Sequence, residues 1–328
     1  MSSRAVHPTT IQRPDPSLPA RSGGTLVRAA APGLTVAVAA SIGVWLTWRV
    51  FVGSAAGQRV DEAVLSGASY GRTRLWQVAE PVLEVVSVPY VAVVLLLAVV
   101  IAVVRRRWAL AVQVALLMGG ANLTTQVLKY LVLDRPELGV GYTGANTLPS
   151  GHTTAAASVS AALVFVVPPR GRPWAAVLGA VYTTATGVST LIGRWHRPSD
   201  VVAAVLVVLA WSGLACALAA LTRPRVAGDV GTATAELARP GRLQLARPDR
   251  LRRAPTTGLG TGLLLLAGLG ATAPAAYALR DSWTAAGALD SRSELLVAYA
   301  GGAFGVAAAC CLAFAVLLVV RQRAGQPV

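Results

Sequence analysis

The chain has 328 residues, of which 55% are hydrophobic and 13% charged, and its formal net charge is +15. A soluble chain of this length would form about two domains, but the mean hydropathy of +0.60 excludes that class. The positive charge does not indicate a nucleic-acid partner, because the arginines gather in short segments between apolar runs, as in cytoplasmic loops. The composition predicts an all-α, polytopic membrane helix bundle.

Eight apolar runs have the length of membrane-spanning helices, about 20 residues each. They are predicted at residues 34–53, 86–104, 108–131, 151–167, 174–193, 199–221, 257–279 and 295–320. The segment between the first two, residues 54–81, is expected outside the cytoplasm, with an interfacial helix around Val60 to Leu65. Cys216, Cys310 and Cys311 lie inside apolar runs, so we interpret them as buried hydrophobic residues rather than disulfides or metal ligands.

Polar segments divide these runs into expected domains. The first six helices form a core at 34–221, and the last two form a separate membrane segment at 257–320 of unassigned role. The remaining segments are expected in the cytoplasm: a disordered tail at 1–33, which is not a cleaved signal peptide, an Arg-rich linker at 222–256 and a tail at 321–328. Two interpretations of the GGAFG stretch in the last helix stay open, a homodimer contact of the G-x-x-x-G kind and a chance match among 32 glycines.

The arginine-dense loops place both chain termini in the cytoplasm, by the positive-inside rule. The loops after the third and fifth helices then face outward, and these two loops hold the unusual polar residues of the chain. The strong preference for Arg over Lys suggests a high-GC bacterial genome. We therefore expect a multi-pass plasma-membrane protein of bacterial origin with a site on the extracytoplasmic side.

The third helix ends with Lys129, the one lysine in the chain. A lysine at this place is often a residue whose ammonium reaches the membrane interface. However, the chain elsewhere uses arginine for that purpose, and Asn122, Gln126 and Lys129 form one polar stripe on a helix. A polar stripe in a membrane helix faces protein or a water-filled cavity, which favours a functional role.

The fourth helix begins with LPSGH, Leu148 to His152. Pro149 and Ser150 suit a helix start, and Gly151 permits close approach of the backbone to a ligand. The free N–H groups at such a start bind anions. An ordinary capped helix start explains the Pro, Ser and Gly, but it does not explain a histidine in a chain with only three.

The fifth and sixth helices are joined by STLIGRWHRPSD, Ser189 to Asp200. His196 and Asp200 are four residues apart, so the carboxylate can hold one ring nitrogen and expose the other as a nucleophile or base. A purely structural His–Asp tie is the alternative. Together, the cations, backbone N–H donors and two histidines of these segments are typical of a phosphoryl-transfer site. The sequence has no cluster of acidic residues that would indicate a metal site.

These three segments resemble the motifs of the type 2 phosphatidic acid phosphatase superfamily, which have the pattern K-x6-R-P, P-S-G-H and S-R-x5-H-x3-D. The resemblance covers the six-helix core, about residues 34 to 221. It implies that His196 attacks phosphorus to form a phosphohistidine, that His152 is the general acid and that Asp200 orients His196. It further implies that phosphate is bound by residues of all three motifs: Lys129, Arg135, Ser150, Gly151 and Ser189.

Two departures from the pattern stand out. The spacing from Lys129 to Arg135 is one residue short, which a loop before Pro136 can absorb. The arginine of the third motif is replaced by Thr190, and Arg194, four residues on, stands where the family usually has glycine. We expect Arg194 to share a helix face with Thr190 and to bind the phosphate in its place; anchoring of the outer interface beside Trp195 is the alternative.

The resemblance implies a lipid phosphate phosphatase that needs no cofactor and no metal. Its expected substrate is a phosphomonoester or diphosphate of a lipid, and it is expected to lie in the bilayer, with the homodimer left open as above. Two alternatives are kept: a lipid phosphotransferase with the same intermediate, and an inactive lipid-binding or scaffolding member. A haloperoxidase, the other activity of this superfamily, is not expected of a membrane protein.

Overall fold

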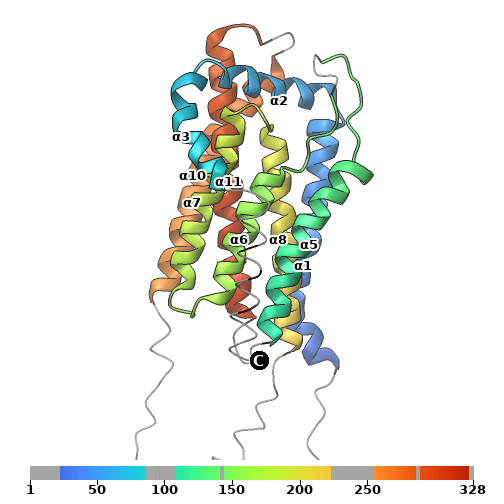
Figure 1. Ribbon diagram of the computed structural model, residues 1–328, viewed down its shortest axis with the longest axis vertical. Helices are drawn as coiled ribbons and strands as arrows, with labels where there is room; N and C mark the ends of the chain where they lie inside the picture. Colours follow the sequence, from blue (N-terminus) through green and yellow to red (C-terminus); the bar gives the residue numbers. More distant parts are fainter. Residues whose placement is uncertain are drawn as a thin grey trace, which may run out of the picture.

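The structure is a computed structural model, and it describes residues 23–85, 108–140, 144–222, 255–285 and 289–324, together with residues 93, 96 and 100. Over these ranges the regular structure is entirely helical, which confirms the predicted all-α class. The long helices run side by side along one axis, and they form a single bundle (Figure 1).

The helices follow one another in the order α1 (Gly23–Thr47), α2 (Ala55–Ala68), α3 (Arg72–Val85), α5 (Trp108–Val127), α6 (Gly151–Val166), α7 (Arg172–Ile192), α8 (Pro198–Leu221), α10 (Pro255–Thr284) and α11 (Arg292–Arg323). Short π-helical turns extend α1 and α5, namely η1 (Trp48–Val52) and η2 (Leu128–Val132). Of the described helices, six are long and apolar enough to cross a membrane: α1, α5, α7, α8, α10 and α11. The protein is therefore a multi-pass membrane protein.

The first helix begins at Gly23 and not at residue 34, because Pro32 does not end it. Gly33 and Gly213 lie at the closest approach of α1 and α8, where a Cβ built on either glycine would come within 2.6 Å of the other's carbonyl oxygen. Only glycine allows two helix backbones to meet in this way. Pro32 and Gly33, which were expected at the end of a disordered tail, are thus part of a packed helix.

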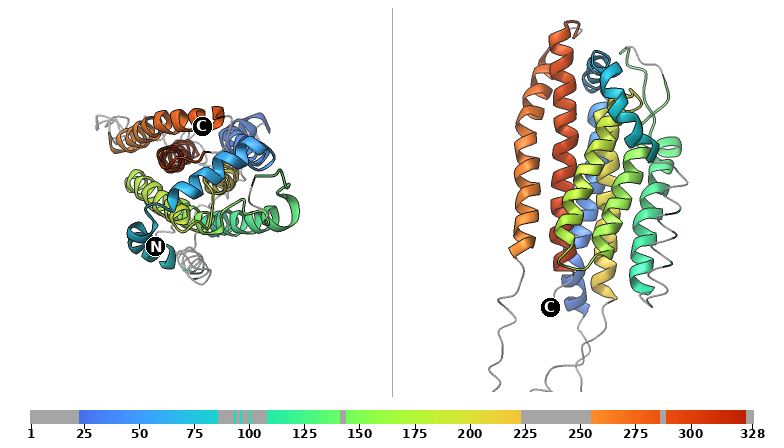
Figure 2. Two further views of the ribbon diagram at one scale, coloured as in Figure 1. Left: turned by 90° about the horizontal axis from the view of Figure 1, so that it is seen from above. Right: turned by 60° about the vertical axis from the view of Figure 1, so that its left-hand side comes forward.

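The segment expected to lie outside the cytoplasm contains more helix than the sequence predicted. The interfacial helix expected around Val60 to Leu65 corresponds to α2, which crosses the end of the bundle (Figure 1), and α3 follows it after a short turn. Seen from above, α2 lies across the ends of the long helices (Figure 2). The helix expected at 86–104 lies almost wholly outside the described residues.

The packed interior contains residues both of the expected six-helix core, 34–221, and of the C-terminal membrane segment, 257–320. One apolar cluster contains buried residues of α5, α6, α7 and α8 together with Phe314 and Leu318 of α11, and a second joins Val64 of α2 to Val201 of α8 and Val306 of α11. Helix α10 lies outside α11 at the edge of the bundle (Figure 2). Thus α11 is part of the same core as the first helices, and α10 packs on its outer side.

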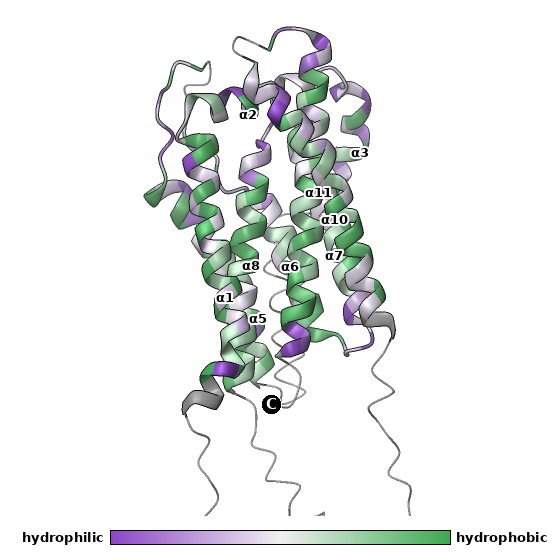
Figure 3. Cartoon of the chain, turned by 180° about the vertical axis from the view of Figure 1, so that it is seen from behind, coloured by the Kyte–Doolittle hydropathy of each residue, from purple (hydrophilic) through white to green (hydrophobic). Residues whose placement is uncertain are grey.

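Hydropathy separates the body of the bundle from its two ends. The middle of the long helices is mainly hydrophobic, whereas polar residues gather at both ends (Figure 3). Cys216 and Cys310 are buried and Cys311 is partly buried, all three as free thiols. The polar end that α2 crosses is also the end at which the three sequence motifs meet.

Candidate active site

The three motifs lie at helix ends that share one side of the bundle (Figure 1). The π turn η2 ends at Val132, α6 begins at Gly151, and the turn between α7 and α8 covers residues 193–197. Because antiparallel neighbours alternate direction, the end of one helix lies beside the start of the next. The fold thereby brings together η2 and the turn at residues 193–197, which are more than 60 residues apart in the sequence.

The pair His196 and Asp200 is buried and directly bonded. Nδ1 of His196 lies 3.1 Å from Oδ2 of Asp200, and the exposed fractions of the two residues are 6% and 0%. The same carboxylate oxygen accepts a hydrogen bond from the backbone N–H of Arg197 at 3.0 Å. A carboxylate at Nδ1 favours the tautomer that carries its proton there, which leaves Nε2 with a free lone pair.

His152 lies across from this pair, in the first turn of α6. Its ring centroid is 6.4 Å from that of His196 and 5.4 Å from that of Trp195. Ser150 caps α6 by accepting a hydrogen bond from the Thr153 N–H at 3.3 Å. The Ser150 N–H donates to the carbonyl oxygen of Asp200 at 2.9 Å, which fixes the second motif directly to the third.

Lys129 lies in η2, a π-helical turn of a kind that often occurs at functional sites. It is close enough to His152 to act on that ring electrostatically. The expected polar stripe is only partly present: Asn122 donates to Ser158 Oγ of α6 at 3.1 Å, but Gln126 is exposed. Beyond α5 the backbone changes to a π-helical turn, with a bond from Leu133 N–H to Leu128 O at 2.9 Å.

Arg135 lies in the loop after η2 and is half-buried. Burial, and next the positive charge of Arg197, lower the pKa of Arg135, while Asp61 and Asp200 act in the opposite direction. The neighbouring Pro136 carbonyl accepts a hydrogen bond from the amide of Gln58 in α2 at 2.9 Å. This hydrogen bond ties the loop that carries Arg135 to α2.

The structure also assigns contacts to residues that the sequence did not single out. Glu62 of α2 forms an ion pair with Arg197, with Oε2 at 3.0 Å from Nη2. Asp61, next to it, accepts a short hydrogen bond from Ser199. Arg197 also donates to Thr147 Oγ1 at 3.3 Å, two residues before Pro149. Two adjacent acidic residues of α2 thus hold both sides of Pro198, the first residue of α8.

A signal for this arrangement was present in the sequence. Gln58, Asp61 and Glu62 are spaced at i, i+3 and i+4, so a helix presents all three on one face. Gln58 and Asp61 are both 1% exposed, which is unusual for a helix at the end of a membrane bundle. A polar face of this kind requires polar partners, and the loop and the α8 start supply them.

The position of Arg194 in the third motif differs from the expectation. Helix α7 ends at Ile192, so Arg194 lies beyond it in a turn and does not share a helix face with Thr190. Arg194 is exposed and has a φ of 60°, a left-handed conformation that favours glycine. This conformation explains why glycine suits the position. Thr190 is fully buried and donates to the Gly187 carbonyl oxygen at 2.7 Å, and Ser189 is buried beside it.

Electrostatics at this end of the bundle combine buried charges of both signs. Burial raises the pKa of Asp61 to about 7, with the charge of Asp200 acting in the same direction and the Ser199 hydrogen bond opposing both. Among the described residues no group of three or more His, Cys, Asp or Glu side chains could hold a metal ion. The arrangement can therefore supply a nucleophilic imidazole, a second imidazole and nearby cations to an anionic substrate.

Comparison with known proteins gives one match: residues 110–223 fit the model of the PAP2 superfamily. No curated protein and no solved structure matches the chain. The match begins inside α5 and ends after α8, so it contains all three motifs, whereas residues 34–109 of the expected core lie outside it. Members of the superfamily are generally phosphatases. The match therefore supports a phosphatase-type function on lipid phosphates in general. The part of the chain that carries the motifs, residues 110–223, belongs to the PAP2 superfamily, the type 2 phosphatidic acid phosphatases.

Proposed function

We propose that the protein is a membrane lipid phosphate phosphatase that works through a phosphohistidine at His196 and needs no metal. The observation that carries this proposal is the buried pair of His196 and Asp200, joined at 3.1 Å, with the ring of His152 at 6.4 Å. Family membership sets the class of reaction. The geometry supports the assignment of individual roles.

In the first step Nε2 of His196 attacks phosphorus, and the bond from phosphorus to the lipid oxygen breaks. Asp200 stabilises the positive charge that develops on the imidazole. The leaving oxygen takes a proton from His152, so the lipid departs as a neutral alcohol. In the second step water attacks phosphorus, the bond from phosphorus to nitrogen breaks, and inorganic phosphate is released while His152 accepts a proton from the water.

The substrate oxygens need positive partners throughout both steps. Lys129 in η2, Arg135 in the following loop, and Ser150 and the Gly151 N–H at the start of α6 are assigned to this task. A compact ammonium with three donors suits a phosphate that changes shape during transfer. Ser189 and Arg194 are assigned to the same phosphate, Arg194 from its exposed turn.

The site lies where η2 and α7 end and α8 begins, and polar residues gather at the ends of the bundle (Figure 3). A substrate with a hydrocarbon tail in the bilayer and a phosphate at its surface fits this depth. We assign this end of the bundle to the extracytoplasmic side of the plasma membrane and the chain termini to the cytoplasm, because the arginine-rich segments are at the other ends of the helices.

The proposal is tested by phosphate release from purified protein with a panel of lipid phosphates. We expect turnover that is insensitive to a chelator and is inhibited by vanadate, which mimics five-coordinate phosphorus. We expect the variant His196→Asn to lose turnover and the variant His152→Asn to accumulate less product per unit time. Acid-labile phosphate on the protein after a rapid quench reports the intermediate directly. Turnover that disappears with chelator, or full turnover in His196→Asn, would contradict the mechanism.

The same experiment separates the two alternatives. An added long-chain alcohol that becomes phosphorylated at the expense of released phosphate identifies a phosphotransferase, because the alcohol then replaces water at the intermediate. Binding of lipid phosphates without any phosphate release identifies an inactive member. Both outcomes leave the family assignment intact.

A further inference from the structure

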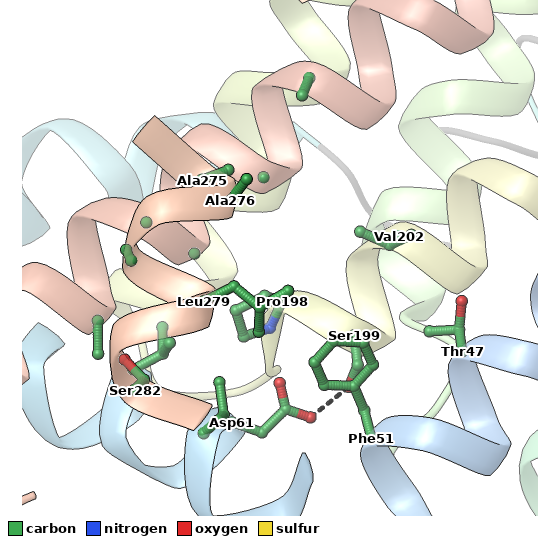
Figure 4. A pocket seen from close by; sticks show the side chains of 18 of the residues that line it. Thr47, Phe51, Asp61, Pro198, Ser199, Val202, Ala275, Ala276, Leu279 and Ser282 are labelled. Carbon is green, nitrogen blue, oxygen red and sulfur yellow. Dashed lines mark hydrogen bonds between the residues drawn. The ribbon is translucent and has the colours of Figure 1, made fainter. Parts of the chain in front are cut away.

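A second site lies on the side of α8 that faces the C-terminal helices. A cavity of about 330 Å³ opens between η1, α2, α8, α10 and α11. This volume is at the lower end of the range for small-molecule pockets. Most of its wall is apolar, formed by side chains such as Phe51, Val202 and Leu279 (Figure 4).

The cavity is separate from the candidate active site. From α8 it takes Pro198, Ser199 and Val202, whereas His196 and Asp200 do not line it. On a helix with 100° per residue, Pro198 and Val202 lie on one face and Asp200 on nearly the opposite one. A ligand in the cavity would therefore contact the back of the segment that carries the catalytic pair.

One end of the cavity is polar. Asp61 lies there, hydrogen-bonded to Ser199 through one carboxyl oxygen, while the other oxygen points toward Pro198 and Leu279 (Figure 4). Ser282 of α10 also lines the cavity; it is 5% exposed, and its hydroxyl has no hydrogen-bond partner within the described part of the chain. A buried hydroxyl without a partner is costly, so this end calls for a ligand with a polar group.

The charge of the lining decides which polar group fits. No Lys, Arg or His is among the residues that line the cavity, and the one ionisable group is a carboxyl. A phosphate or carboxylate head would meet Asp61 without a cation to compensate it. A hydroxyl both donates and accepts, so it can bond with a carboxyl and with a serine at once.

We propose that this cavity binds a neutral long-chain lipid alcohol, with the chain along the apolar wall and the hydroxyl at Asp61 and Ser282. This is the chemical class that the proposed phosphatase reaction releases, so the identity of the ligand rests on the proposed function. Because burial raises the pKa of Asp61 to about 7, both protonation states are accessible. The ionised carboxyl accepts a hydrogen bond from the alcohol, and the protonated carboxyl donates one.

The test uses the full-length protein in detergent with two photoreactive probes, a long-chain alcohol with a diazirine in its chain and the phosphate ester of the same alcohol. The protein is also prepared as His196→Asn, so that the ester is not converted to the alcohol during labelling. Labelled positions are found by mass spectrometry. Phosphate release is measured separately, so a failed phosphatase assay does not affect the result of the labelling.

Two matched glycine variants report whether the label enters the cavity. Gly305 lines it and has open space, since a Cβ there meets only Ala275 Cβ at 3.9 Å. Gly305→Leu therefore fills the cavity without displacing the backbone. Gly270 of α10 has nothing within 4 Å of its Cβ position and does not line the cavity, so Gly270→Leu is the control. Ser282→Ala removes only the hydroxyl.

We expect the alcohol probe to label α10 and α11 at the cavity, to be displaced by unlabelled alcohol, and to lose this label in Gly305→Leu but not in Gly270→Leu. Ser282→Ala should weaken binding about fivefold, as expected for one hydrogen bond. Equal labelling by the phosphate ester in His196→Asn would overturn the proposal and make the cavity a substrate-tail site. Label spread along the lipid-facing helices and unchanged in Gly305→Leu would overturn it as well, by showing only surrounding lipid.

Discussion

The ion pair between Glu62 and Arg197 allows a quantitative test of how α2 acts on the active site. We consider Glu62→Gln, which keeps the shape and one hydrogen-bond acceptor but removes the charge. The two charged groups are 3.0 Å apart, and their side chains are 31% and 3% exposed. With an effective dielectric constant of 20, this distance corresponds to a gross attraction of about 5 kcal/mol.

The net contribution is smaller. Desolvation of Arg197 and the partial exposure of Glu62 reduce it to about 1–2 kcal/mol. The backbone N–H of Arg197 donates to the carboxylate of Asp200, so a displaced Arg197 also displaces the partner of His196. Neither Glu62 nor Arg197 is assigned a contact with substrate. We therefore expect kcat to fall about tenfold, the equivalent of 1.4 kcal/mol, with a smaller change in KM.

The assay is phosphate release from proteoliposomes for Glu62→Gln, Arg197→Gln and the double variant. We expect a coupling free energy of about 1 kcal/mol in kcat, because either single change removes the same ion pair. Arg59→Gln is the control, since Arg59 is an exposed residue of the same helix. Additive effects, with a coupling below about 0.5 kcal/mol, or equal losses in Arg59→Gln, would refute a positioning role for the pair.

Three further outcomes follow from single side chains. Asp200→Asn should lower kcat by a factor of about 100 to 10,000 with little change in KM, because the amide no longer fixes the tautomer and charge of His196; vanadate inhibition should persist. Since the pKa of Asp61 is raised to about 7 from 3.8, the folded state is favoured at low pH and loses up to about 4 kcal/mol of stability between pH 4 and pH 7. Thermal unfolding of Asp61→Asn in detergent should lack this decline, and a parallel decline in both proteins would contradict the assignment. Arg194→Gly keeps the left-handed turn but removes its steric cost, about 1 kcal/mol for an arginine, so stability should not fall. KM should rise about tenfold if the guanidinium binds phosphate, and an unchanged KM would contradict that role.

The chemistry of the site was accessible from the sequence because it depends on rare residue types. One lysine and two of three histidines stand within a few residues of helix ends, and hydropathy alone locates those ends to within a few residues. Apolar runs likewise predicted the long helices, since membrane length leaves few alternatives. The family match over residues 110–223, which contain these motifs, agrees with this class of reaction.

Other features could not be read from the pattern, because they depend on how distant segments pack. Pro32 and Gly33 resemble the end of a disordered tail, and only the contact of Gly33 with Gly213 shows why the helix continues through them. The assumed helix face shared by Thr190 and Arg194 required α7 to continue past Ile192, but a turn follows instead. The contacts of Glu62 and Asp61 could not be predicted, because their partners Arg197 and Ser199 are 135 and 138 positions away in the sequence.

The start of α8 is the element on which these features converge. One face carries the carboxylate that orients His196, and the nearly opposite face, at Pro198 and Val202, forms part of the cavity toward α10. Asp61 contacts Ser199 directly, and Glu62 contacts Arg197, so α2 holds this turn from the residues on either side of Pro198. A ligand that bonds with the second oxygen of Asp61 shares this carboxyl with the Ser199 hydroxyl. Occupation of the cavity therefore has a direct physical route to the position of Asp200, through one turn of helix.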